Sequence, residues 1–151
     1  NRVSIEKRPA VVDQRSRIGD WEIDTIVGAH HQGVLLSLVE RKSRLCLIAR
    51  LANKSAQEVE RTTINLLDSI KEKVHTVTSD NGKEFAKHES IAKNLDAQFF
   101  FAHPYASWER GLNENTNGLI RQYFPKKTQF NHISDQQVQS VMEKLNNCSR
   151  K

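Results

Sequence analysis

The chain has 151 residues, the size of one compact domain, and folding at that length buries roughly two-thirds of the unfolded chain's surface. Hydrophobic residues make up 37% and charged residues 27%, which excludes the low hydrophobicity of a disordered chain. No apolar run approaches the roughly 20 residues that cross a bilayer, and two cysteines form neither a disulfide framework nor a zinc pattern. The net charge of +5 favours a polyanionic partner such as nucleic acid, with a merely solvated basic surface as the alternative. We expect a soluble, intracellular protein.

The first 17 residues are basic and have no hydrophobic periodicity. Their cationic side chains are Arg2, Lys7, Arg8, Arg15 and Arg17. This composition suggests a basic arm or linker over 1–17, followed by one catalytic-core domain over 18–151. Because the chain begins without Met and ends without a helix stop signal, we expect it to be a fragment of a longer protein.

Three consecutive segments have the patterns of strands. The run 19–28 alternates between two faces, with Asp24 on the less apolar one. A turn sequence follows at 30–33, and two apolar runs, 34–39 and 45–51, suit buried strands. Three short strands joined by tight turns predict an antiparallel meander.

From residue 55 the pattern changes to alternating helices and strands. Ser55 precedes a helical pattern that reaches Ile70, with a capping-box spacing to Glu58. The elements predicted after it are a strand at 74–78, a helix at 84–95, a strand at 97–102, a helix at 107–124 and a last helix, capped by Ser134, up to Asn147. Such alternation requires parallel pairing with crossover helices. We therefore predict an α/β fold with a mixed five-stranded sheet, first an antiparallel meander and then parallel strands, flanked by helices.

Three carboxylates lie where metal ligands are commonly found. Asp24 is in the middle of a strand, Asp80 comes just after one, and Glu114 is on a predicted helix. Each also has a simpler interpretation, as a partly exposed strand residue, a turn-forming aspartate or a solvated helix residue. Hard cations such as Mg²⁺ take oxygen ligands, and two such ions can activate a hydroxyl and stabilise a leaving oxygen in phosphoryl displacement.

Five ordered motifs add a family resemblance. They are W-E-I-D-T-I-V-G at 21–28, V-E-R-K-S-R at 39–44, S-D-N-G-K-E-F at 79–85, H-P-Y-A-S-W-E-R-G at 103–111 and N-E-N-T-N-G-L-I-R-Q-Y-F-P-K at 113–126. Together they resemble the integrase catalytic core of the Asp-Asp-Glu transposase and retroviral integrase superfamily, and within it the insertion-sequence-thirty family of bacterial transposases. The match covers about Gly19 to Lys151, and 33 residues separate Asp80 from Glu114, a spacing similar to that of the superfamily.

This resemblance implies a ribonuclease-H-like fold in which Asp24, Asp80 and Glu114 bind two Mg²⁺ or Mn²⁺ ions. It implies an enzyme that cleaves DNA at the ends of an insertion sequence and transfers the strands to target DNA. DNA would be the partner, with at least a dimer in the DNA complex, in the bacterial cytoplasm at the nucleoid. Where the family motif has a tyrosine this chain has Ser107, with Tyr105 two positions earlier, so a tyrosine role there is open.

Basic and amide residues near Glu114 are candidates for DNA contacts. Arg110, Glu114, Asn117 and Arg121 are spaced i, i+4, i+7 and i+11, so they share one helix face. The alternative for the arginines is a set of Arg-Glu ion pairs worth about 0.3–0.5 kcal/mol each. Further candidates outside this face are Lys83, Lys126 and Lys127.

Two other functions stay open at this point. One is a ribonuclease-H-like metal-dependent nuclease that cuts without strand transfer, and the other is a non-catalytic DNA-binding domain. A glycosidase carboxylate pair is poorly supported by the positive charge. The histidines lack metal-ligand spacing, and Cys148 and Ser149 depart from the family's terminal pattern.

Overall fold

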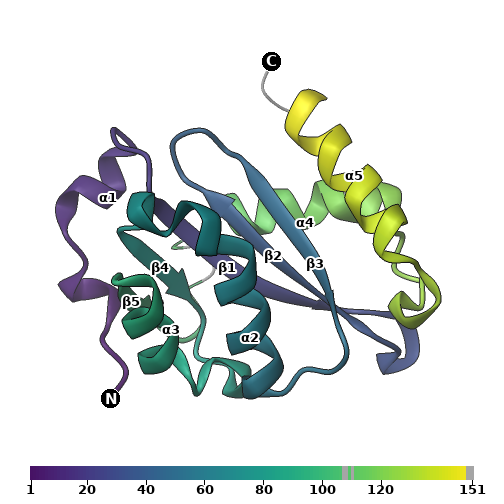
Figure 1. The fold of residues 1–151 in the computed structure, drawn as a ribbon, viewed down its shortest axis with the longest axis horizontal. Coiled ribbons are helices and arrows are strands. Elements are labelled where there is room, and N and C mark those ends of the chain that lie inside the picture. The colour runs from purple at the N-terminus through teal and green to yellow at the C-terminus, as the bar shows by residue number, and fades with distance from the viewer. Residues whose placement is uncertain (107–108, 110, 149–151) are drawn as a thin grey trace.

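The computed structural model describes residues 1–106, 109 and 111–148. Five strands form one sheet in the order β3-β2-β1-β4-β5 (Figure 1). Their bounds are β1 (Asp20–Val27), β2 (Val34–Glu40), β3 (Cys46–Leu51), β4 (Thr76–Ser79) and β5 (Gln98–Phe101). β1, β2 and β3 pair antiparallel, whereas β4 runs parallel to β1 and β5 parallel to β4. The mixed sheet predicted from the sequence is confirmed.

Helices cover both faces of this sheet. Their bounds are α1 (Ala10–Gln14), α2 (Ala56–Leu67), α3 (His88–Leu95), α4 (Gly111–Tyr123) and α5 (Asp135–Cys148). In Figure 1, α2 and α3 lie in front of the sheet and α4 lies behind it. None of the helices within the described ranges is long and apolar enough to cross a membrane.

Two hydrophobic cores lie on the two sides of the sheet, because successive strand residues point to opposite faces. Trp21 and Ile23 of β1 belong to the core under α2 and α3, and Ile26 belongs to the core under α4 and α5. Cys46 is in the second core, where burial raises the pKa of its thiol to about 12. A thiol with so high a pKa stays protonated and unreactive at neutral pH.

Serine caps begin two of the helices as predicted. The Ser55 hydroxyl accepts a hydrogen bond from the Glu58 amide at 3.2 Å, while the Glu58 carboxylate turns to the Ala52 amide. At α5 the exchange is reciprocal: Ser134 accepts from the Gln137 amide at 3.1 Å, and the Gln137 side chain accepts from the Ser134 amide at 2.7 Å. Side-chain caps of this kind satisfy the free amides of a first helical turn.

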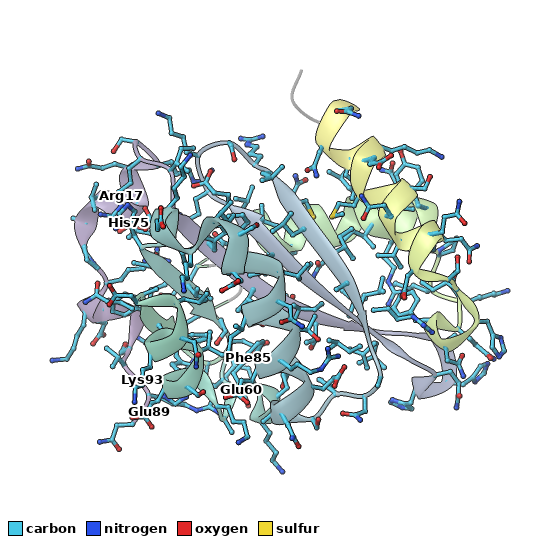
Figure 2. All side chains as sticks on the ribbon, viewed as in Figure 1. Arg17, Glu60, His75, Phe85, Glu89 and Lys93 are labelled. Atoms are coloured by element: carbon cyan, nitrogen blue, oxygen red, sulfur yellow. The ribbon has the colours of Figure 1, made fainter. Side chains whose placement is uncertain are left out.

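The predicted helix at 84–95 begins later than expected. A 3-10 turn, Lys83–Phe85, comes first, and α3 starts at His88. Glu84 and Phe85 are both buried in this turn, and Phe85 lies beside α2 in the view of Figure 2. Burial of two consecutive side chains of opposite polarity holds the backbone in a turn, so the helix start predicted at Glu84 was wrong.

The segment 1–17 packs against the domain. It contains α1, whose Val12 is fully buried. The Arg8 guanidinium donates to the Thr78 hydroxyl at 3.0 Å, and that of Arg2 lies 4.5 Å from the centre of the Phe101 ring. These contacts come from single residues without periodicity, which is why the sequence pattern did not indicate them. The position of the domain boundary stays a prediction.

Glycines at two places should respond oppositely to substitution. Gly33 has φ +88, and a Cβ there would collide with the backbone nitrogen of Asn131, so Gly33→Ala should lower the free energy of unfolding by about 2 kcal/mol. Gly118 lies in the middle of α4, and a Cβ there would meet nothing within 4 Å, so Gly118→Ala should raise the free energy of unfolding by about 0.5–1 kcal/mol. Urea denaturation measures both changes, and a loss of stability at Gly118 would contradict this account.

Candidate active site

Asp24 and Asp80 lie level with each other at the sheet. The parallel register of β1 and β4 pairs Asp20 with Thr76 and Glu22 with Thr78. Two residues beyond the last pair, in step along both chains, come Asp24 and Asp80. Both are partly buried. The fold therefore brings together two of the three carboxylates that the sequence singled out.

Hydrogen bonds orient both aspartates. The Thr25 amide donates to one oxygen of Asp24 at 2.9 Å, and the side-chain amide of Asn117 donates to the other at 2.8 Å. The Gly82 amide donates to Asp80 at 2.8 Å. N–H donors thus fix the direction in which each carboxylate points.

The helix α4 lies along β1. Asn117 contacts Asp24 and also accepts from the Ser37 hydroxyl at 3.3 Å. Arg121 donates to the Val27 carbonyl at 2.9 Å and stacks 5.2 Å from the centre of the Phe130 ring. Burial lowers the pKa of the Arg121 guanidinium from its ordinary value. Two of the predicted DNA contacts are therefore engaged with the protein at this site.

Glu114 is exposed on α4, one helical turn before Asn117. Across residues 1–106, 109 and 111–148, no three His, Cys, Asp or Glu side chains are grouped closely enough to hold a metal ion. The structure places Glu114 on the helix that contacts Asp24, with its side chain in solvent.

A fourth carboxylate, that of Glu84, lies in the turn that follows Asp80. It is buried, accepts a hydrogen bond from the Thr25 hydroxyl at 2.7 Å and lies 3.6 Å from the Lys54 ammonium. A Cβ on Gly82 would collide with it, so only glycine lets the turn close over this side chain. Glu84 therefore ties the turn that carries Asp80 to β1. The sequence analysis did not single out Glu84, and the glycine two residues before it was the available signal.

The other predicted DNA contacts are on the surface or outside the described residues. Lys83, Lys126 and Lys127 are exposed, the last two just after α4. Arg110 and Ser107 lie outside the described residues. Tyr105 is fully exposed. Along the chain, Lys83 comes three residues after Asp80, and Lys126 and Lys127 are neighbours.

His103 links the N-terminal segment to the residues before α4. Its Nδ1 lies 2.8 Å from the Glu109 carboxylate and its Nε2 3.1 Å from that of Glu6. Hydrogen bonding to Glu109, with a smaller contribution from Glu6, raises the pKa of the imidazole above its ordinary value. Because both ring nitrogens face carboxylates, the geometry suits the doubly protonated ring.

Comparison with known families bears directly on this arrangement. Residues 14–107 match the model of the integrase core domain. The chain belongs to the integrase core domain family. Members of this family typically depend on divalent metal ions. The resemblance stated from the motifs is confirmed.

Two curated relatives are transposases of bacterial insertion sequences. The transposase for insertion sequence element IS4351 of Bacteroides fragilis is 48% identical over 150 residues, which are 99% of this chain and 46% of that protein. Transposase InsI for insertion sequence element IS30A of Escherichia coli (strain K12) is 36% identical over 152 residues, covering 100% of this chain and 39% of that protein. The chain thus spans less than half the length of these relatives.

Solved structures show the same fold. The catalytic core domain of BIV integrase superposes with a TM-score of 0.68 at 20% identity, covering 85% of this chain and 84% of that one. A chain of the simian T-cell lymphotropic virus intasome in complex with a PP2A regulatory subunit superposes with a TM-score of 0.71 at 18% identity, covering 87% and 49%. The ribonuclease-H-like fold expected from the resemblance is confirmed.

The contacts of His103 predict its titration. The imidazole of the folded protein should titrate with a midpoint above 6.5, measured from its ring proton signals in NMR spectra. Glu109→Gln should lower this midpoint more than Glu6→Gln, because Glu109 is the larger cause. A group whose pKa is raised by folding stabilises the protein fully below its unfolded pKa and loses that effect as the pH rises through the folded pKa. The stability advantage of the native chain over His103→Asn should therefore shrink above pH 6.5; a midpoint at or below 6.5 would contradict the geometry.

Proposed function

We propose that this domain is the catalytic core of an insertion-sequence transposase, cleaving DNA and transferring its strands with metal ions held by Asp24, Asp80 and Glu114. The observation that carries the proposal is the parallel register of β1 and β4, which puts Asp24 of β1 in step with Asp80, the first residue after β4, together with the hydrogen bond from α4 to Asp24. Membership of the integrase core family supports the same conclusion.

The donor set suits a hard divalent cation. Mg²⁺ and Mn²⁺ favour carboxylate oxygens, and two partly buried aspartates supply them, one on β1 and one directly after the neighbouring β4. Glu114 is exposed on the helix that already contacts Asp24, so its side chain can turn toward the aspartates without a change of fold. When bound, two ions would activate an attacking oxygen and stabilise the leaving one.

The protein's own contribution is orientation. Asn117 holds one oxygen of Asp24, and the Gly82 amide holds Asp80. Glu84 fixes the turn that carries Asp80, because its carboxylate accepts a hydrogen bond from the Thr25 hydroxyl of β1. Side chains held in this way enter the reaction with little reorganisation, which is the main gain that an enzyme has from a rigid site.

The reaction is a pair of phosphoryl transfers. In the first, water attacks a phosphodiester at the end of the element, the phosphorus–O3′ bond breaks, and a 3′-hydroxyl is released with a 5′-phosphate on the other product. In the second, this 3′-hydroxyl attacks a phosphodiester of the target, and the target's own O3′ leaves. Neither step needs a nucleophilic side chain, so we expect no covalent bond between protein and DNA.

The net charge of the chain and the proposed reaction together indicate which partners the protein has. A net charge of +5 and the exposed side chains of Lys83, Lys126 and Lys127 favour binding to the phosphate backbone. Because transposition joins both ends of one element, at least two copies of the protein would act together on the DNA. We place this activity in the bacterial cytoplasm at the nucleoid, where the substrate is found.

Asp24→Asn tests the assignment of the triad. The substitution keeps the size of the side chain but removes the charge that a cation needs, so strand transfer in Mg²⁺ should fall on the order of a hundredfold or more. The measurement is the joining of labelled element-end duplexes to plasmid DNA by the purified protein.

Asp68→Asn is the matched control. Asp68 begins the 3-10 turn Asp68–Lys73, its side chain is 67% exposed, and it lies outside the site, so joining should remain at the native rate. Joining at the native rate by Asp24→Asn would contradict the triad. Cleavage of the duplexes by the native protein without any joining would instead indicate a nuclease of the same fold.

A further inference from the structure

A buried ion pair lies beside the site and is not part of the triad. Glu22 on β1 is fully buried and pairs with the guanidinium of Arg41, which follows β2 and is itself almost fully buried. Removing two charges from water costs several kcal/mol per ion, and the attraction between them often does no more than offset that cost. Stability alone therefore does not account for the pair.

Glu22 has a second partner in α4. Its other oxygen accepts a hydrogen bond from the Asn113 backbone amide at 3.0 Å. Asn113 is the third residue of α4, in the first turn of the helix, where backbone amides commonly need a partner from outside the helix. A carboxylate at this position satisfies the amide and interacts favourably with the positive end of the helix dipole. A residue of the central strand thus caps the helix that carries Glu114.

Arg41 extends the same connection to the N-terminal segment. Its Nε donates to the Val12 carbonyl at 3.2 Å, and its backbone amide donates to the Asp20 carbonyl at 2.8 Å. Arg41 is therefore held from two sides, by α1 and by β1. A guanidinium fixed in this way holds the Glu22 carboxylate in one orientation, which a solvated partner could not do.

The contacts between β1 and α4 have matching spacings. Glu22 and Asp24 are two residues apart on one face of β1, a distance of about 6.6 Å along a strand. Their partners Asn113 and Asn117 are four residues apart on α4, about 6 Å along a helix. The helix therefore runs beside the strand, and the two contacts, Asn113 with Glu22 and Asn117 with Asp24, have the same spacing on both elements. Along the helix, Glu114 lies between the two contacting asparagines.

We propose that Glu22 and Arg41 are positioning residues that fix the start of α4, so that Glu114 lies within reach of the two aspartates. They touch neither DNA nor metal ion in this role. Its effect on DNA joining rests on the proposed function, whereas the anchoring of α4 can be measured without it. Loss of the Asn113 contact should lower the rate of joining and leave the affinity for DNA unchanged.

Two double variants distinguish the effect of the hydrogen bond to the Asn113 amide from the effect of the two buried charges. Glu22→Gln with Arg41→Met removes both charges but leaves an amide oxygen that can accept from the Asn113 amide. Glu22→Leu with Arg41→Met removes the acceptor as well. Replacing both members of a buried pair avoids leaving one charge uncompensated. The first variant should join DNA within a few-fold of the native rate, and the second should be slower by on the order of a hundredfold at saturating DNA.

Hydrogen exchange gives a readout that does not depend on activity. The Asn113 backbone amide should exchange at least about tenfold faster in the Leu/Met variant than in the Gln/Met variant, because only the latter retains its acceptor. Should the Leu/Met variant fail to fold, Glu22→Asp replaces it. The shorter side chain cannot span Arg41 and Asn113 together, so exchange at Asn113 should again be faster than in the native protein.

Ser55→Ala is the matched control, because it removes a helix cap of the same kind from α2, away from Glu114. It should lower the urea concentration at the midpoint of unfolding and leave the joining rate unchanged. Native joining by the Leu/Met variant, equal loss in both double variants, or unchanged exchange at Asn113 would each overturn the proposal. If the native protein itself joins no DNA, the proposed function fails, and exchange at Asn113 still decides whether Glu22 anchors α4.

Discussion

The parallel pairing of β1 with β4 is the constraint on which the site depends. It puts Asp24 of β1 in step with Asp80, the first residue after β4, although 55 residues lie between them in the sequence. Because β1 is central in the sheet, with β2 on its other side, this pairing cannot shift without disturbing both hydrophobic cores. Glu84 adds a local tie by joining the turn after β4 to Thr25. The aspartates thus have a rigid base.

The third carboxylate is placed by a helix and not by the sheet. α4 is bound to β1 through Asn113, Asn117 and Arg121, so its direction follows the strand. Glu114 lies on the exposed flank of this helix, where it can change rotamer while the backbone stays in place. In the proposed function, one adaptable carboxylate beside two fixed ones would let the site admit DNA and release it after joining.

Local patterns predicted much of the fold. Alternation in 19–28 indicated β1, and the serines at 55 and 134 marked the starts of α2 and α5, since strands and caps depend on neighbours in the sequence. Glu22 escaped prediction because a polar residue on an alternating strand reads as solvated, whereas α4 covers that face and Arg41 neutralises the charge. The triad itself came from motif resemblance; spacing along one chain cannot show that two strands will pair.

Diffraction from crystals grown with Mn²⁺ and an element-end duplex tests the central claim most directly, because anomalous scattering locates the ions independently of the protein's atomic positions. The account predicts Mn²⁺ at about 2.0–2.3 Å from carboxylate oxygens of Asp24, Asp80 and Glu114, with Glu114 turned toward the sheet. Ions bound elsewhere on the DNA complex, with none at these three carboxylates, would contradict it.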